Sequence, residues 1–302
     1  EKVLDIINKY QYRPNSIAQG LVTGSIKIIS VIVPNIQNPF YSEVVSFIEH
    51  TLCEKGYHMF LYCSDNDPEK EYAALEMASQ FNFAGTILIS IVNDAQLIEK
   101  SNNAQRPLLL LNRYIETVSR DILTTDNFHI SYIATRYLIE LGHSRIAIIA
   151  GGKTTSTHRE RRDGFLNALS TYHLQFPPEF DCISDLSMDS GYNIGETFLQ
   201  MGADAPTAVF CTSDIMAIGL MQAYKNVGKS IPGDISIVGF DDIPIASLNG
   251  ISLTTIRQPY KDIGRHAVDM ILRRIEDSTL PQQKMILDCE FITRGSTGPK
   301  KM

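Results

Sequence analysis

The chain has 302 residues, of which 44% are hydrophobic, and a net charge of −7 from 27 Lys and Arg against 34 Asp and Glu. Two domains with separate cores fit this length. The acidic balance argues against a nucleic-acid-binding surface over most of the chain, so any DNA contact must be local. The five scattered cysteines suggest neither a disulfide framework nor a metal site. No apolar run approaches the roughly 20 residues of a bilayer span and the first residues do not form a signal peptide, so we expect a cytoplasmic protein without a membrane partner.

The first 25 residues differ in character from the rest. Glu1–Tyr10 has apolar residues at helical spacing but no capping residue, which is typical of the tail of a helix. Tyr12–Gly24 predicts a second, short helix. Gly20 lies inside it and costs roughly 1 kcal/mol relative to Ala, so this helix should be marginal alone in water. A plain surface linker is the alternative interpretation.

From residue 28 onwards, apolar strands alternate with amphipathic helices. Near-continuous apolar strands are typical of a parallel sheet that is covered on both faces. In the first half we expect strands at 28–33, 57–63, 86–91 and 107–111, with helices at 40–55, after Pro68 and from Asp94.

The alternation then begins again and ends in segments that cross back between the halves. In the second half we expect helices at 128–141, 158–170, 190–201 and 214–227, with strands at 146–150, 180–183, 208–211 and 235–239. The crossing segments are 252–257, a helix at 260–275 and a closing strand at 285–292. This order predicts an α/β fold of two doubly wound parallel-sheet lobes, with the cleft between them as the default ligand site.

Six motifs in a fixed order connect the chain to a known family. They are Tyr12-Arg13-Pro14-Asn15, Asn38-Pro39-Phe40-Tyr41, Leu141-Gly142-His143, Arg161-Arg162-Asp163-Gly164-Phe165, Ser213-Asp214-Ile215-Met216-Ala217, and Gly239-Phe240-Asp241-Asp242 with Leu253-Thr254-Thr255-Ile256. On these motifs the chain resembles the lactose-repressor and galactose-repressor family of bacterial transcription regulators, over essentially its whole length.

The resemblance implies a DNA-binding headpiece, a hinge helix and a two-lobed sensor like the type I periplasmic sugar-binding proteins, joined by three crossovers and working as a homodimer. It implies this division: 1–25, headpiece remnant and hinge helix; 26–126 with 259–289, N-terminal lobe; 127–258 with 290–302, C-terminal lobe. Residues 1–10 would correspond to the last headpiece helix, so most of the headpiece lies outside this sequence.

In the family, paired hinge helices enter the minor groove of operator DNA and a leucine wedges between base steps. The free-energy cost of unstacking the bases is then offset because the bent DNA makes more contact with the protein. Leu21 suits the role of the wedging leucine. Asn15 and Ala18 are the other hinge residues that the resemblance singles out for DNA contact. Gln19 stands where the family usually has Arg, and Gly20 where it has a non-glycine residue. Both departures should weaken the hinge or shift its operator preference.

Charged residues in the second half are candidates for contact with an effector. Asp241 follows a strand, where its carboxylate could accept hydrogen bonds from hydroxyl groups, and the family places an effector-contacting aspartate there; a turn or helix cap is the alternative. Asp214 opens a helix, so an N-cap role competes with effector contact. Arg161 lies in a basic cluster that is usually a solvated face, but the resemblance directs its guanidinium into the cleft.

The first half offers aromatic and polar candidates. Phe40 and Tyr41 could form a stacking wall for a ring, and core packing is the alternative for Phe40. The other effector-binding candidates are Asn112, Arg113, Asp126 and Leu186. Leu186 stands where the family often has an aromatic lid. With Arg113 and Arg161 both present, we expect a polar or anionic, sugar-like effector.

Enzymatic signals are missing from the sequence. Gly152-Lys153-Thr154 resembles the end of a phosphate-binding loop, but the first glycine of that motif would fall at Ala147, inside a strand. No dinucleotide or zinc motif and no nucleophile motif occurs, so we expect no cofactor, no metal and no enzyme. The resulting hypothesis is a sugar-responsive, DNA-binding transcriptional repressor. The alternative is the sugar-binding protein of a transporter, which should carry a signal peptide and lack the hinge.

Overall fold

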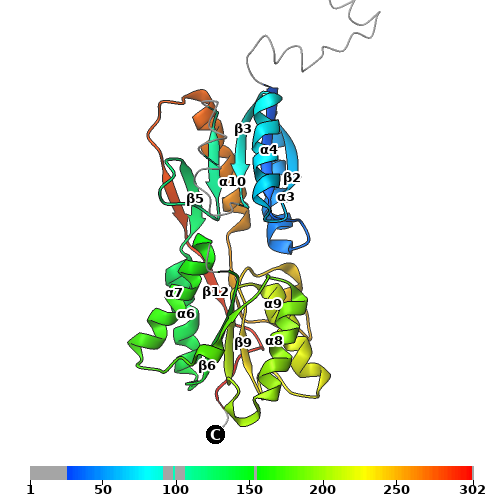
Figure 1. Cartoon of the computed structure of the whole chain (residues 1–302), viewed down its shortest axis with the longest axis vertical. Helices are drawn as coiled ribbons and strands as arrows, with labels where there is room; N and C mark the ends of the chain where they lie inside the picture. Colours follow the sequence, from blue (N-terminus) through cyan, green and yellow to red (C-terminus); the bar gives the residue numbers. More distant parts are fainter. Residues whose placement is uncertain (1–25, 91–97, 99–105, 153–154, 301–302) are drawn as a thin grey trace, which may run out of the picture.

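The computed structural model describes residues 26–90, 98, 106–152 and 155–300. The predicted headpiece remnant and hinge helix lie outside these residues, together with the hinge positions Asn15, Ala18 and Leu21. The helix expected from Asp94 also lies outside them, apart from Ile98. The described residues form two α/β lobes placed end to end (Figure 1). Within them, no helix is both long and apolar enough to cross a bilayer.

The N-terminal lobe is built on one parallel sheet. Its strands lie in the spatial order β11 (Lys284–Leu287), β5 (Asp121–Thr125), β4 (Leu108–Leu111), β3 (Phe83–Leu88), β1 (Ile26–Val33) and β2 (His58–Cys63). All neighbouring pairs run parallel. Helices α3 (Pro39–Glu54) and α10 (Tyr260–Glu276) cover one face, and α4 (Pro68–Gln80) contributes to the core on the other. The sheet is therefore doubly wound.

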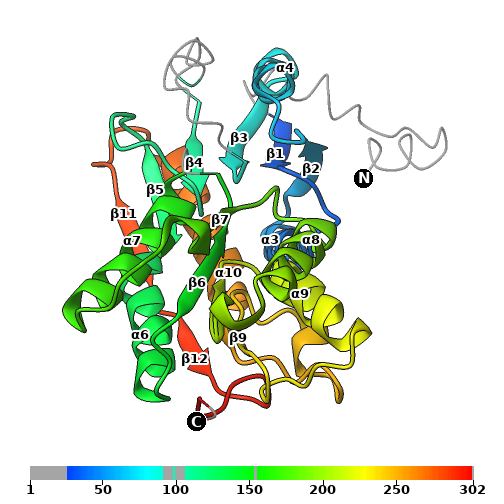
Figure 2. The same ribbon diagram turned by 60° about the horizontal axis from the view of Figure 1, so that its bottom comes forward.

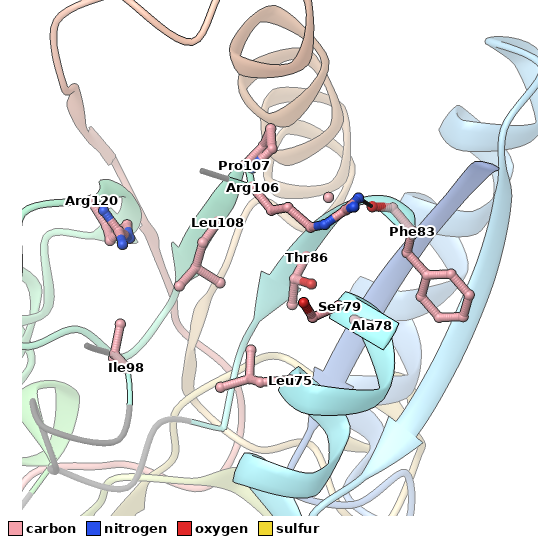
Figure 3. A pocket seen from close by; sticks show the side chains of 11 residues that line it. Leu75, Ala78, Ser79, Phe83, Thr86, Ile98, Arg106, Pro107, Leu108 and Arg120 are labelled. Carbon is pink, nitrogen blue, oxygen red and sulfur yellow. Dashed lines mark hydrogen bonds between the residues drawn. The ribbon is translucent and has the colours of Figure 1, made fainter. Parts of the chain in front are cut away.

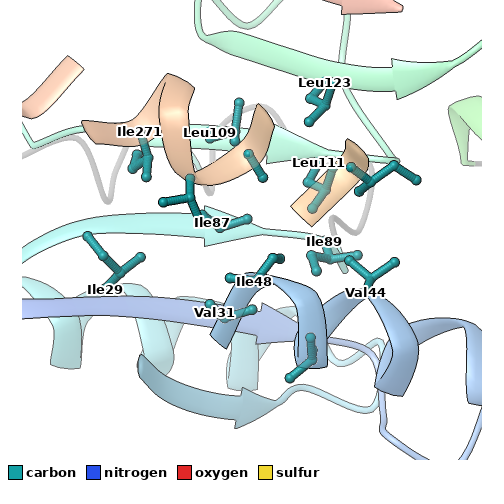
Figure 4. Close-up of a cluster of buried hydrophobic side chains, with 14 of the residues drawn as sticks. Ile29, Val31, Val44, Ile48, Ile87, Ile89, Leu109, Leu111, Leu123 and Ile271 are labelled. Carbon is teal, nitrogen blue, oxygen red and sulfur yellow. The ribbon is translucent and has the colours of Figure 1, made fainter. Parts of the chain in front are cut away.

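Apolar burial on both faces holds this sheet together. Figure 4 shows Ile48 of α3 and Ile271 of α10 approaching the same strands, among them β3 at Ile87. These three side chains are almost wholly buried, and each contributes roughly 1.5–3 kcal/mol by leaving water. Helix α3 begins at Pro39 because the side chain of Asn38 accepts a hydrogen bond from the N–H of Phe40, at 3.0 Å.

The C-terminal lobe repeats this plan on a smaller sheet. Its parallel strands lie in the order β7 (Asp181–Ile183), β6 (Ile146–Ala150), β8 (Ala208–Cys211) and β9 (Ser236–Val238). The helices are α6 (Asn127–Glu140) and α7 (Ser156–Thr171) on one face, and α8 (Met188–Gln200) and α9 (Asp214–Asn226) on the other, as Figure 2 shows. Short 3-10 turns lie at Pro178–Phe180, Gly202–Asp204 and Pro244–Ser247.

The chain passes between the lobes three times. It leaves β5 for α6, returns from β10 (Thr255–Arg257) to α10, and leaves β11 for β12 (Glu290–Ile292). Strands β10 and β12 pair antiparallel, and two isolated parallel bridges join Val238 of β9 to Thr254 and Asp241 to Arg257 of β10. The predicted fold class is confirmed in its two doubly wound parallel-sheet lobes. The residue boundaries of the lobes given above remain our proposal.

Three predictions of local structure were wrong. Strand β5 was not predicted, since it is short and polar at both ends. The single closing strand at 285–292 is two strands, because the chain changes lobes at Asp288 and Cys289. Asp214 is not the N-cap of α9; Ser213 holds that position, and the carboxylate of Asp214 is used elsewhere.

Candidate functional site in the interlobe cleft

A pocket of about 310 Å³ lies where the two lobes meet. One side comes from loops that follow β1, β2 and β4, and the other from the loop after β7 and from the first turns of α8 and α9. Its lining residues are Pro34, Asn35, Gln37, Asn38, Tyr41, Asn66 and Arg113 from the first lobe, and Asp185, Leu186, Ser187, Met188 and Ile215 from the second. The carboxyl ends of parallel strands thus converge on one cavity, as expected for this class of sheet.

Unusual backbone conformations gather at this edge of both sheets. Residues with φ between 55° and 69° follow strands of the first lobe at Asp65, Asn66 and Asn112, and Leu186 follows β7 with φ of 69°. Non-glycine residues seldom adopt this left-handed conformation, which costs about 1–3 kcal/mol at each position. Strained residues of this kind concentrate at binding sites, so they mark the cleft independently of the cavity.

Arg113 is the cation of the pocket. Its guanidinium donates to the side-chain oxygen of Asn66 at 2.7 Å, to the carbonyl of Ser90 at 3.2 Å and to the hydroxyl of Tyr41 at 3.1 Å. Among the residues that the structure describes, no carboxylate lies within 4.0 Å of it. The charge is therefore held in position by neutral partners at the wall of the pocket.

The opposite wall of the pocket carries the carboxylate of Asp185 and the N-terminus of α8. Asp185 accepts a hydrogen bond from the N–H of Ser187 at 2.9 Å, and hydrogen bonds from Ser187 lower the pKa of its carboxyl. Ser187 also caps α8, accepting from the N–H of Ser190 at 3.0 Å. Leu186 adds an apolar contact between these polar groups. Arg113 and Asp185 thus face the same cavity from different lobes.

Beneath the cleft, Asp241 is held by side chains from two loops. Its carboxylate accepts from Gln258 Nε2 at 2.8 Å and from Ser213 Oγ at 3.1 Å. Burial raises its pKa to about 6, and the positive charge of Arg161 opposes that shift. Its φ of 123° places it in a conformation that side chains rarely adopt.

Asp214 is wholly buried beside it. One carboxylate oxygen accepts from the hydroxyl of Thr255 at 2.5 Å, and the other from the N–H of Ile243 at 2.9 Å. Gly239 makes this possible, because a Cβ there would lie 2.1 Å from Asp214 Oδ1. The side chain therefore joins the start of α9 to the segments after β9, which is a structural role.

Arg161 is 5% exposed and bonded within its own lobe. It donates from Nε to Asn127 at 2.8 Å and from Nη1 to the carbonyl of Thr212 at 2.8 Å. Its guanidinium lies 3.5 Å from the ring centre of Phe240. Burial lowers its pKa, and Asp241 opposes that effect. The solvated-face interpretation is therefore wrong for Arg161.

The lobes also touch along the start of α7. The backbone N–H of Tyr114 donates to Ser156 at 2.9 Å, and its hydroxyl donates to Glu160. Lys284 of β11 donates to the same hydroxyl at 3.0 Å. Burial and the neighbouring carboxylate of Glu160 raise the pKa of Tyr114 well above its usual range, so the hydroxyl stays a donor.

The sequence-predicted residues divide into three groups. Tyr41, Arg113 and Leu186 line the cleft pocket. Phe40 and Asn112 line a neighbouring void of about 10 Å³, where Phe40 packs edge-on against Tyr41. The residues engaged within the protein instead are Asp126, which caps α6, and Arg161, Asp214 and Asp241. Whether any of these residues binds an effector stays a prediction.

Several lining residues were not singled out by the sequence analysis. They are Asn35, Gln37, Asn38, Asn66, Asp185, Ser187, Met188 and Ile215. Most of them follow β1, β2 or β7 directly, and the rule that ligands bind beyond strand ends could have found them.

Comparisons with known proteins agree with this geometry. A family profile described as a periplasmic binding protein-like domain matches residues 135–297. The chain is 32% identical over 300 residues to the HTH-type transcriptional repressor PurR of Haemophilus influenzae strain PittEE, covering 98% of this chain and 89% of that protein. It is 31% identical over 290 residues to the repressor CytR of Escherichia coli K12, covering 95% and 84%.

A solved structure gives the same result in three dimensions. A LacI family transcriptional regulator from Enterococcus faecium with bound ribose is 30% identical, has a TM-score of 0.78, and is matched over 91% of this chain and 100% of that chain. The fold and the pocket define a two-lobed, periplasmic-binding-protein-like sensor. The chain belongs to the LacI family of bacterial transcriptional regulators. These relatives are transcriptional regulators rather than enzymes.

Proposed function

We propose that this chain is a transcriptional repressor that binds a small sugar-like effector in the interlobe pocket and thereby changes its affinity for operator DNA. The observation that carries the proposal is the pocket itself, since Arg113 and Tyr41 of one lobe and Asp185 and Leu186 of the other line a single cavity. A ligand there would touch both lobes at once. Membership in a family of repressors supports the DNA-binding part.

The chemistry of the lining supports a polyhydroxylated ligand. Eight of the twelve lining residues carry amide, hydroxyl, guanidinium or carboxylate groups and four are apolar, and a volume of about 310 Å³ lies at the small end of ligand pockets. Arg113 can donate to two adjacent hydroxyls or to an anionic group. Asp185, on the wall of the pocket that the second lobe contributes, can accept hydrogen bonds from hydroxyl groups of the ligand. The Enterococcus faecium relative has ribose bound, which supports a sugar of similar size here.

The switch would act through the arrangement of the two lobes. An effector can shift the equilibrium between two arrangements of the lobes only if it makes different contacts with each of them. A ligand that bridges Arg113 and Asp185 favours the closed arrangement, and the change in spacing would pass to paired hinge helices in a homodimer. Leu21 is the residue we assign to DNA insertion, and it lies outside the described residues.

The first test is calorimetry with ribose, other pentoses, hexoses and their phosphates. We expect saturable binding of at least one of these compounds. Arg113→Gln should weaken it by 10-fold or more, since hydrogen bonds to charged groups contribute about 1.5–3 kcal/mol. Arg265→Gln is the matched control, because Arg265 is exposed on α10 and pairs with Asp262. Binding of no compound in the series, or equal affinity in both variants, would contradict the proposal.

The second test concerns DNA. Operator fragments selected with the full-length protein should bind with an affinity that the effector changes. Leu21→Ala should weaken DNA binding and leave effector binding intact. Sugar binding with no effect on DNA would instead favour the transporter-type alternative. A monomer at micromolar concentration in equilibrium sedimentation would count against the dimer.

A further inference from the structure

Three asparagines on the first-lobe wall of the interlobe pocket use their side-chain oxygens within the protein. Oδ1 of Asn35 accepts from the N–H of Asn38 at 3.1 Å, and Oδ1 of Asn38 accepts from the N–H of Phe40 at 3.0 Å. Oδ1 of Asn66 accepts from the guanidinium of Arg113 at 2.7 Å. Each bond fixes the orientation of its amide group, because an N–H can only donate and its partner must be the oxygen.

These bonds leave the amide nitrogens of the wall as donors for a ligand. In the part of the chain that the structure describes, Nδ2 of Asn35, Asn38 and Asn66 donates to no protein group. The hydroxyl oxygen of Tyr41 accepts from Arg113, so its proton is also left to donate. A neutral sugar hydroxyl both donates and accepts, and matches such a wall only in part. An oxyanion has acceptors alone and matches it fully.

The positive charge of Arg113 is buried on the same wall. The residue is 3% exposed, and its acceptors are neutral oxygens of Asn66, Ser90 and Tyr41. Its Nε has no hydrogen-bond partner among the described residues. Taking a cation out of water without an opposite charge is costly. An anion in the pocket would offset this cost through charge-assisted hydrogen bonds.

The start of helix α3 adds to the positive potential of this wall. The helix has 16 residues, begins at Pro39 directly after Asn38, and has no acidic residue in its first turn. The N-terminus of a helix carries roughly half a positive elementary charge, which a nearby anion compensates. Because Asn38 and Tyr41 both line the pocket, this helix terminus and Arg113 act on the same region.

The second-lobe wall carries the opposite sign. Asp185 is the one carboxylate among the described residues that line the pocket, and it is exposed. Water screens an exposed charge more strongly than a buried one, so Asp185 does not cancel the effect of Arg113 at the other wall. A carboxylate accepts hydrogen bonds from hydroxyl groups. The two walls therefore suit a ligand whose two ends differ.

We propose, building on the function proposed above, that the effector is an acidic sugar, a polyhydroxylated molecule with one terminal oxyanion. The oxyanion binds the first-lobe wall, at Arg113 and the amide groups of the three asparagines. The hydroxyl groups at the other end of the molecule bind Asp185. The oxyanion is a phosphate or a carboxylate, which share the negative charge and the acceptor oxygens that this wall recognises.

An arginine at the other end of strand β4 provides a contrast (Figure 3). Arg106 precedes the strand and donates to the carbonyl of Phe83 at 2.7 Å and to the side chain of Asn82 at 2.6 Å. The void that it lines has a volume of about 30 Å³ and shares no lining residue with the interlobe pocket. Arg106 is thus a control for the loss of a guanidinium elsewhere in the same lobe.

The test is a calorimetric titration of the full chain with matched ligands at constant ionic strength. Ribose is compared with the phosphate ester of its primary hydroxyl, and glucose with its corresponding phosphate ester and with glucuronate. We expect at least one acid to bind about tenfold more tightly than its neutral parent, since charge-assisted hydrogen bonds are roughly twice as strong as neutral ones. Preference for a phosphate ester or for glucuronate identifies the oxyanion.

Asn38→Asp tests the position of the oxyanion. Aspartate caps a helix as well as asparagine does, so α3 should keep its start and the thermal unfolding curve should stay close to that of the wild type. The amide donors are replaced by a negative charge, so the acid should bind about tenfold more weakly and the neutral parent should lose far less. Asn249→Asp adds the same charge at an exposed turn of the second lobe and should change neither affinity.

Arg113→Gln should bring the affinities for acid and neutral parent close to each other, and Arg106→Gln should leave their ratio unchanged. A neutral sugar that binds the wild-type protein as tightly as its acid would overturn this inference and leave the proposed function standing. So would a preference for the acid that persists in Arg113→Gln, or equal weakening of both ligands by Asn38→Asp. Binding of none of the probes, neutral or acidic, would overturn the inference and the proposed function together.

Discussion

Burial and the adjacent carboxylate of Asp241 together raise the pKa of Asp214 to about 8. The two acids lie in one buried cluster, where Ser213 binds Asp241 and Thr255 binds Asp214. Arg161 supplies positive charge to Asp241 and opposes the rise of its pKa. The cluster therefore has fewer positive than negative groups, and Asp214 holds its proton at neutral pH.

This relationship predicts how stability depends on pH. The pKa of Asp214 in the folded protein lies above its value of about 4 in an unfolded chain. Between these values only the folded state keeps the proton, so the free energy of unfolding falls as pH rises, by at most about 1.4 kcal/mol per pH unit. Above about pH 8 both states are ionised and this dependence ends.

Urea denaturation of Asp214→Asn across this range checks the prediction. The asparagine cannot ionise, so the stability of the wild-type protein relative to the variant should fall by on the order of 2 kcal/mol between pH 5 and pH 7. The same substitution at the exposed Asp262 controls for the change of side chain. Parallel curves for the wild type and Asp214→Asn would show that Asp214 is already ionised at pH 5.

The contact between Tyr114 and Glu160 should couple the two lobes. A double-mutant cycle with Tyr114→Phe and Glu160→Gln is expected to give a coupling energy of about 0.5–1.5 kcal/mol in urea denaturation, since one partly buried hydrogen bond is lost. Tyr172→Phe, at the exposed end of α7, should show no coupling to Glu160. Additive effects of the first pair would mean that the lobes do not depend on this bond.

The crossing of α8 and α9 should not tolerate a side chain at Gly219. A Cβ there would lie 2.0 Å from the carbonyl oxygen of Met188, and a Cβ at Gly191 would lie 2.2 Å from that of Met216. Gly219→Ala should therefore cost about 3 kcal/mol or more through overpacking, despite the better helix propensity of alanine. Gly202→Ala, with open space but φ of +60°, should cost only about 1 kcal/mol. A gain in stability for Gly219→Ala would contradict the close crossing.

Much of the fold could be predicted from apolar patterning alone. Strands such as Ile146–Ala150 and Ala208–Cys211 are continuous apolar runs, and their predicted limits are correct. Strand Asp121–Thr125 could not be found this way, because Asp121 and two threonines surround only two aliphatic residues. It is buried because β4 and β11 flank it, and that neighbourhood is set by residues distant in sequence.

The site was harder to predict than the fold. The sequence places Arg113 and Leu186 after strands, and the structure brings both to one pocket. It does not reveal that Arg161 and Asp214 are turned into the protein, because that depends on partners far along the chain. Asn127, for example, is 34 positions from Arg161, and Gly239 provides the space that Asp214 fills.

The three passages between lobes also govern the order in which the protein can form during synthesis. The strands of the C-terminal lobe, from β6 to β9, are complete once residue 238 has left the ribosome. The sheet of the N-terminal lobe lacks β11 until residue 287 has followed, so β5 remains an unpaired edge for most of translation. The parallel sheet that begins first is thus completed last, and the exposed edge of β5 is the surface of the nascent chain that folding helpers would need to shield.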